Sequence, residues 1–294
     1  MRRIPKAITT LLVAAVVVGG AFPAAFASKA DEKKDEGPTE EEVEAAVAKI
    51  EKVLDEGSFE DKVKVLVEVR TVQHEDVAKE VAKAIKDDAK EVRTAAVQTL
   101  GYLKVDSSLK ELTSLTKKKK YTEDEDMAIE IYKSIGRHGS KKSLKVLEDD
   151  ILNSTEKVLQ TRILAIGHVR DDDSVELLIG LMNKMKGNRG GGKGGPGEGK
   201  ENIPNMQQFR LALHVLTGAD EGLDRRDWQR WWNDNKHDLD VTDEYPELDK
   251  GLETQWKSYW GEGDKKDRKR EREDGRDEPG GDRGEDPGAE PLAA

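Results

Sequence analysis

The feature that most constrains the fold is an internal repeat. Gly101, Gly136 and Gly167 are 35 and 31 residues apart, and apolar residues recur at fixed offsets around them. These offsets are one and nine positions before each glycine, and eight and eleven after it. The register comprises Leu100, Ile135 and Ile166; Val92, Met127 and Val158; Leu109, Leu144 and Val175; and Leu112, Leu147 and Leu178. This spacing predicts two amphipathic helices in each repeat.

A helical-hairpin repeat of this length predicts an α-solenoid, because no single unit can bury its apolar stripe alone. A degenerate earlier copy fits with Arg70 at the glycine position. No run of alternating β-branched residues suggests a sheet. We expect each glycine to lie in the turn between the two helices. A capping residue should follow the glycine: Asp106, Ser140, or one of Asp171 to Ser174.

Two stretches resemble the first helix of a HEAT repeat, in particular the short bacterial type called lyase-like. They are VRTAAVQTLG at residues 92–101 and LQTRILAIG at residues 159–167. The resemblance covers roughly residues 58–185 and weakly 205–240, and it departs from the family at residues 127–136, where Ile129, Ile131 and Tyr132 replace small residues. It implies an all-α solenoid that scaffolds other proteins. Some family members look like chromophore lyases, but the N-terminal segment described next predicts export, and an exported protein has no obvious access to such a substrate.

Residues 1–27 read as a secretory signal peptide. Arg2, Arg3 and Lys6 precede an apolar run, and Ala25-Phe26-Ala27 gives a small-x-small cleavage pattern. The alternative is an uncleaved membrane anchor, although the run is shorter than the ~20 residues of a spanning helix. After cleavage no stable membrane span is expected. We therefore expect an exported protein, periplasmic or extracellular, with 47 basic and 61 acidic residues and a net charge of −14.

Changes in composition divide residues 28–294 into five expected segments. A charged leader covers residues 28–38. HEAT-like repeats at 39–186 begin with a capping box at Thr39–Glu42, and Gly57 ends the first helix. A Gly-rich flexible loop is expected at 187–203, the last helices and a Trp-rich cap at 204–260, and a disordered charged tail at 261–294.

Motifs that would carry chemistry fail their tests. The chain has no cysteine, which excludes disulfides and thiolate sites. Gly187 to Lys193 matches a phosphate-loop spacing, but Gly194 stands where Ser or Thr is needed. The five histidines form no pair at helical spacing; His138 and His168 fall in equivalent turns, where solvation is the simpler expectation. Asp171 to Asp173 lack the spacing of a calcium loop and favour a helix cap.

We therefore expect no catalytic residue, no metal and no cofactor, and a protein that is not an enzyme. The acidic balance also argues against nucleic acid as a partner. The run Lys117–Lys120 is followed by Glu123–Asp126. The lysines follow the C-terminus of one helix and the acids open the next, where each charge complements the helix dipole. We therefore favour a structural role over an anion-binding patch. Thr122 with Glu125 is expected to form a capping box for the following helix.

Half of the aromatic residues lie near the end of the helical region: Trp228, Trp231, Trp232, Tyr245, Trp256, Tyr259 and Trp260. Trp228, Trp231 and Trp232 have the spacing of a core-facing helix stripe. We favour a cap over the last repeat, and the alternative is recognition of a sugar or peptide.

Second helices line the concave face in HEAT-type arrays, so the resemblance implies a lysine row there. Lys79, Lys110 and Lys145 recur at one place in successive repeats, and Lys83 lies one turn beyond Lys79. The row would suit an acidic segment of a partner protein, although an ordinary solvated face explains it too. The favoured function is a non-catalytic scaffold in the cell envelope. The alternative is an envelope enzyme or subunit that recognises polysaccharide or peptide through the Trp-rich region.

Overall fold

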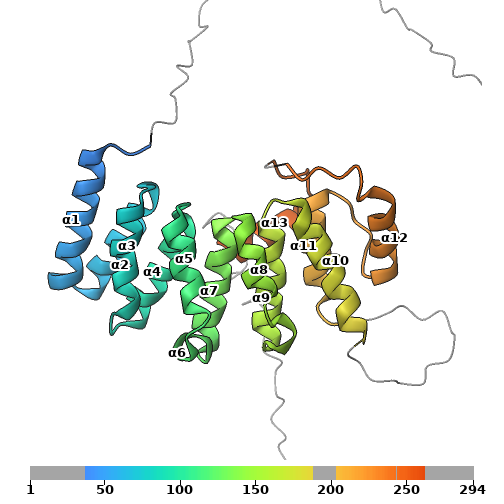
Figure 1. The fold of residues 1–294 in the computed structure, drawn as a ribbon, viewed down its shortest axis with the longest axis horizontal. Helices are drawn as coiled ribbons and strands as arrows, with labels where there is room; N and C mark the ends of the chain where they lie inside the picture. The colour runs from blue at the N-terminus through green and yellow to red at the C-terminus, as the bar shows by residue number, and fades with distance from the viewer. Residues whose placement is uncertain (1–36, 188–202, 243, 262–294) are drawn as a thin grey trace, which may run out of the picture. The chain divides into compact units, whose positions relative to one another are not determined.

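The computed structural model describes residues 37–187, 203–242 and 244–261, and these residues form thirteen α-helices and four short 3₁₀ segments with no strand (Figure 1). The predicted all-α fold is confirmed. The expected signal peptide, nearly all of the leader, most of the Gly-rich loop and the charged tail after Gly261 lie outside the described residues.

The helices from residue 38 onward form two layers that follow the predicted repeat. Each first helix packs against the first helix of the next repeat, and the second helices lie beside them (Figure 1). The first layer comprises α2 (Phe59–Glu68), α4 (Lys90–Tyr102), α7 (Glu125–His138), α9 (Glu156–His168) and α11 (Met206–Thr217). The second comprises α1 (Glu40–Glu56), α3 (Glu75–Lys83), α5 (Asp106–Leu115), α8 (Leu144–Glu148), α10 (Asp172–Gly187) and α12 (Arg225–Asn235). Shorter pieces are α6 (Lys119–Thr122), η1 (Val69–Thr71), η2 (Ala84–Lys86), η3 (Lys141–Ser143) and η4 (Ile151–Asn153).

The repeat glycines lie inside the last turn of the first helices, so their expected placement in the inter-helix turn was wrong. Their role is close packing between neighbouring first helices. A β-carbon added at Gly101 would come within 2.8 Å of Ser134, and one added at Gly167 within 2.6 Å of Ala212. These contacts join each first helix to the next one, and only a residue without a side chain leaves room for them.

Helix starts match the sequence in part. The Thr39–Glu42 capping box is confirmed, since each residue's backbone N–H donates to the other's side chain at 3.2 and 2.8 Å. Gly57 caps the end of α1. Asp171 accepts from the N–H of Asp173 at 2.9 Å at the start of α10, and Ser140 caps η3.

Two expected caps were wrong. Val105 is the N-cap of α5, and Asp106 is the first helical residue, paired with Lys142 at 2.9 Å. The cap of α7 is Asp124, whose side chain accepts from the N–H of Met127. Thr122 belongs to the preceding α6 and donates to a carbonyl there, so its hydroxyl stands too early for α7.

The last segment returns to the first layer. Arg170, just after α9, donates to the carbonyls of Val215, Thr242 and Glu244, and its guanidinium lies 5.0 Å from the ring centroid of Tyr245. Helix α13 (Lys250–Trp260) then packs its tryptophans against His168 of α9. Within the described ranges, no helix combines the length and apolar character that crossing a membrane requires.

Candidate functional site

The four lysines singled out in the sequence lie exposed on second-layer helices, but their surroundings differ. Lys79 and Lys83 both belong to α3. Lys79 pairs with Asp76 at 2.7 Å, and Lys83 contacts Glu80 at 2.5 Å and Glu51 at 3.6 Å. The hydrogen bonds to these carboxylates raise the pKa values of both lysines. Neighbouring acids therefore offset the positive charge of α3.

Lys110 lies in a groove between α5 and α8 that is rich in lysine. Its basic residues are Lys110, Lys117, Lys118 and Lys142, and its other lining residues are Asp106, Leu109, Thr113, Ser114 and Val146. The groove has a volume of about 750 Å³. It opens where the second layer is thin, because α8 has only five residues. Half-buried Val146 and buried Leu109 give it an apolar floor.

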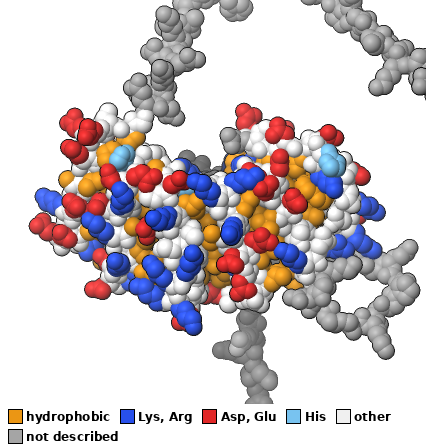
Figure 2. Space-filling model, viewed as in Figure 1, with side chains coloured by type: hydrophobic (Ala, Val, Ile, Leu, Met, Phe, Trp, Pro, Cys, Tyr) orange, Lys and Arg blue, Asp and Glu red, His pale blue; other side chains and the backbone are white. Residues whose placement is uncertain are grey.

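One acid touches this groove. Asp106 is bonded to Lys142 at 2.9 Å, which leaves three exposed lysines beside the apolar floor. Figure 2 shows that basic, acidic and hydrophobic side chains are interspersed over the visible face of the molecule. Charge alone therefore does not set this groove apart. The groove is distinguished by the combination of several lysines with apolar surface in one concavity.

Lys145 lines a different groove, between α8 and α10. There it and Lys184 face Glu148, Asp149 and Asp150, and Lys184 pairs with Glu148 at 2.8 Å. The predicted lysine row thus shares one layer of helices, but acids accompany it at both α3 and α8. Among the grooves that lysines of this row line in the described part of the chain, the α5–α8 groove is the one with more basic than acidic residues.

The tryptophans serve mainly in packing. Trp228, Trp256 and Trp260 are buried, whereas Trp231 and Trp232 are half-buried. Of the three tryptophans predicted to form the core-facing stripe, only Trp228 is fully buried. Helix α12 packs on α10 and buries Trp228, which lies at the N-terminal end of the stripe, more completely than the other two tryptophans.

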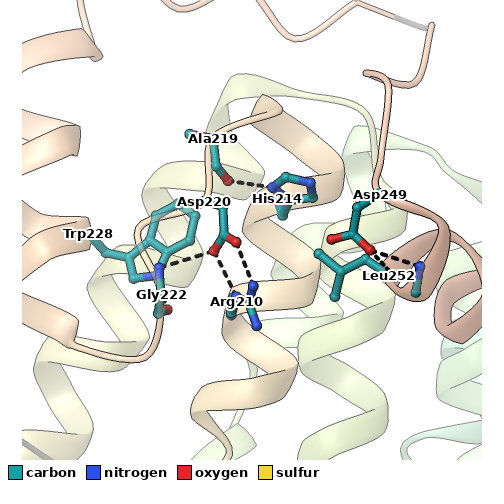
Figure 3. A network of polar contacts seen from close by, with 9 residues as sticks. Arg210, His214, Ala219, Asp220, Gly222, Trp228, Asp249 and Leu252 are labelled. Carbon is teal, nitrogen blue, oxygen red and sulfur yellow. Dashed lines mark hydrogen bonds and ion pairs between the residues drawn. The ribbon is translucent and has the colours of Figure 1, made fainter.

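A polar network fixes the turn that leads into α12 (Figure 3). Arg210 binds Asp220 through two nitrogens, one at 2.7 Å, and this pairing lowers the pKa of Asp220 to about 2. Asp220 also accepts from the N–H of Gly222 at 3.1 Å. The indole N–H of Trp228 donates to the carbonyl of Gly222 at 3.0 Å, so the buried ring has its polar atom satisfied. These contacts indicate a structural cap.

A groove beside the tryptophans offers aromatic surface to a ligand. It has a volume of about 500 Å³, and its lining includes exposed Tyr245, Pro246, Leu248 and the edge of Trp256. The alternative of ligand recognition through the Trp-rich region rests on this groove.

Neither turn histidine is freely solvated, contrary to expectation: His138 is buried and His168 is half-buried. His138 ends α7 with Nε2 3.2 Å from the carbonyl of Val105, and His168 stacks on Trp256 at 6.0 Å between ring centroids and contacts Trp260 at 4.2 Å. Burial lowers the pKa of His138, and burial together with the charges of Lys104 and Arg137 lowers that of His168 to about 4. Across the described ranges no cluster of three metal-ligating residues is present.

Sequence reasoning missed a cationic and aromatic cluster on the first layer. The position after each repeat glycine holds Tyr102, Arg137 and His168, and Arg70 and Lys104 lie beside them. The signal was available in the register. A face that is only solvated has no reason to place an aromatic ring, a guanidinium and an imidazole at one repeat position.

The comparison with known families agrees with this architecture. The family model for HEAT repeats matches residues 79–165, which span α4, α5, α7, α8 and most of α3 and α9. The fold is an all-α solenoid of HEAT-like helical hairpins. A comparison with curated proteins gives no match.

Proposed function

We propose that this protein is a non-catalytic, exported scaffold that binds an acidic segment of another protein in the cell envelope. The observation that carries the proposal is the α5–α8 groove, where Lys110, Lys117 and Lys118 stand beside an apolar floor. HEAT repeats generally mediate protein interactions, which makes a protein the expected occupant.

The chemistry of the groove favours a particular kind of segment. Three exposed ammonium groups favour carboxylates, and the surface of Val146 and Leu109 favours an apolar side chain between them. A single exposed ion pair contributes only about 0–1 kcal/mol, so affinity depends on several pairs acting with apolar contact. An extended acidic segment with interspersed apolar residues meets both conditions.

The test uses a short fluorescein-labelled peptide that alternates glutamate and leucine, with binding followed by fluorescence anisotropy. The Lys110→Glu/Lys118→Glu double variant should bind about tenfold more weakly, since attraction becomes repulsion in the groove. Lys79→Glu/Lys83→Glu is the matched control, because it changes the net charge equally on a neighbouring helix whose lysines already face acids.

Binding by the control variant should stay within about twofold of the original, and rising salt should weaken binding by the unmodified chain. Equal losses in both double variants would show that only overall charge matters, and the groove would then have no specific role.

A further inference from the structure

We infer that Arg70, Lys104 and Arg137 form a binding site for a small oxyanion, a carboxylate or phosphate group, beside Tyr102 on the first layer of helices. The site is separate from the α5–α8 groove, which belongs to the second layer, so the inference does not depend on the proposed function.

Arg137 is the central residue. Arg137 is only 7% exposed. Its guanidinium lies 4.7 Å from the ring centroid of Tyr102 and 5.7 Å from that of Trp260. Nη2 donates to the carbonyl of Trp260 at a long 3.4 Å. Nη1 is buried and has no hydrogen-bond partner among the described residues. A buried charged donor without an acceptor is costly and rare in folded proteins.

A second unsatisfied donor lies next to it. The indole Nε1 of Trp260 is also buried without a hydrogen-bond partner in the described part of the chain. Its ring is the one that Arg137 approaches from 5.7 Å. Two N–H donors in neighbouring side chains thus lack an oxygen acceptor, and an oxyanion bound between them would supply one.

Two further cations lie close by, Arg70 over the ring of Tyr102 and Lys104 beside the backbone of Arg137. The guanidinium of Arg70 lies 4.5 Å from the Tyr102 centroid, and its hydrogen bonds go to neutral oxygens of Thr99 and Gln98 at 3.3 and 3.5 Å. Lys104 donates through Nζ to the backbone carbonyl of Arg137. Among the described residues, no carboxylate comes within ion-pair distance of these three cations.

The lowered pKa values of two of these cations also support an anion site. Burial, followed by the charge of Arg137, lowers the pKa of Lys104 to about 8 and also lowers the pKa of Arg70. The cluster therefore holds like charges close together without a counter-charge. A bound anion would remove this repulsion, which gives it an affinity beyond that of its hydrogen bonds.

Arg162 shows how this fold treats a buried arginine that has only a structural role. Its guanidinium also lies over a tyrosine, 4.5 Å from the Tyr132 centroid. Unlike Arg137, it donates through all three nitrogens, to backbone carbonyls and to Ser154. Stacking on tyrosine thus does not by itself leave a guanidinium without acceptors, and the open donor of Arg137 requires another explanation.

The ligand class follows from the donor geometry. Guanidinium groups bind carboxylate and phosphate through paired hydrogen bonds. Trp260 closes one side of the cluster, so the bound group must be small. Such a group comes either from a free solute or from an acidic side chain or phosphate on a larger molecule, and the chemistry of recognition is the same.

Isothermal titration calorimetry of the full chain in low-salt buffer tests the site, with inorganic phosphate and glutarate as separate probes. At least one probe should bind with one-to-one stoichiometry, and the comparison separates phosphate from carboxylate preference. Arg70→Gln and Trp260→Phe should each weaken binding, by about tenfold for Arg70→Gln because a charge-assisted contact is lost. Both replacement side chains are smaller than the originals, and circular dichroism verifies that the variants still fold.

Lys110→Gln is the charge-matched control in the other layer and should leave the affinity unchanged. Failure of both probes to bind would overturn the inference. So would an equal loss in Lys110→Gln, or full affinity in both Arg70→Gln and Trp260→Phe.

Discussion

Gly136 of α7 lies so close to Ala165 of α9 that a β-carbon added at Gly136 would stand 2.6 Å from the β-carbon of Ala165 and 2.7 Å from its α-carbon. The neighbouring atoms belong to backbone and a β-carbon, so they cannot move aside as a flexible side chain would. The contact explains why the repeat register centres on glycine. At these glycines an added β-carbon would meet backbone atoms of the next first-layer helix.

Gly136→Ala should therefore destabilise the protein by about 1–3 kcal/mol, because overpacking exceeds the gain in helix propensity. Urea unfolding measures the change. The matched control is Gly180→Ala in α10, where a β-carbon would meet nothing within 4 Å. That substitution should stabilise the protein by about 0.5–1 kcal/mol. Changes of the same sign in both variants would contradict the close-packing argument.

The repeat could be predicted from sequence because apolar spacing directly reflects burial. Val92, Leu100 and Leu112 occupy their expected core positions with no exposed surface. The placement of the glycines could not be predicted, because glycine is equally suited to a turn and to a close helix contact. Only the distance between helices distinguishes the two, and a single sequence does not contain it.

The candidate sites were also predicted only in part from the sequence. The lysine positions followed from the register, but the acids that offset Lys79 and Lys83 include Glu51 of α1, and its proximity depends on tertiary packing. The return of α13 onto α7 and α9 joins Trp260 to Arg137 across 123 residues. No local pattern encodes that contact, so the repeat register could reveal Tyr102, Arg137 and His168 but not the position of Trp260 beside them.

Trp228 is the residue whose loss should most weaken the end of the solenoid. Its side chain is fully buried and hydrogen-bonded to Gly222. Trp228→Ala should cost roughly 3–5 kcal/mol, and Trp231→Ala clearly less because its ring is half-buried. Thermal melts of the two variants provide the comparison. If Trp231→Ala lowered the melting temperature as much as Trp228→Ala, the cap would depend on the whole stripe rather than on Trp228.

The N-terminal sequence predicts cleavage after Ala27, which would place Ser28 at the mature N-terminus. N-terminal sequencing of protein purified from its native host measures this directly. Replacing Ala27 with a bulky residue should slow processing, because the cleavage position requires a small side chain. Recovery of intact Met1 in the membrane fraction of the unmodified protein would instead indicate an anchor.

His168 should make stability depend on pH between about 6.5 and 4. Its pKa falls from 6.5 to about 4 in the folded protein, because packing against Trp256 and Trp260 removes water from its ring and Lys104 and Arg137 lie near it. The unfolded chain therefore binds a proton at this site before the folded chain does. Stability is complete above pH 6.5 and declines as the pH falls toward 4, by roughly 2 kcal/mol at pH 5.

His168→Phe keeps a ring between the tryptophans and removes the titration, so its free energy of unfolding should vary less over this range. Some dependence should remain, because burial also lowers the pKa of His138. The contribution of Asp220, whose pKa is about 2, disappears only below pH 4 and so falls outside the window. Urea titrations at neutral pH and at pH 5 measure the effect, with the exposed His237→Gln as control. A His168→Phe curve parallel to that of the unmodified protein would show that His168 does not control the response.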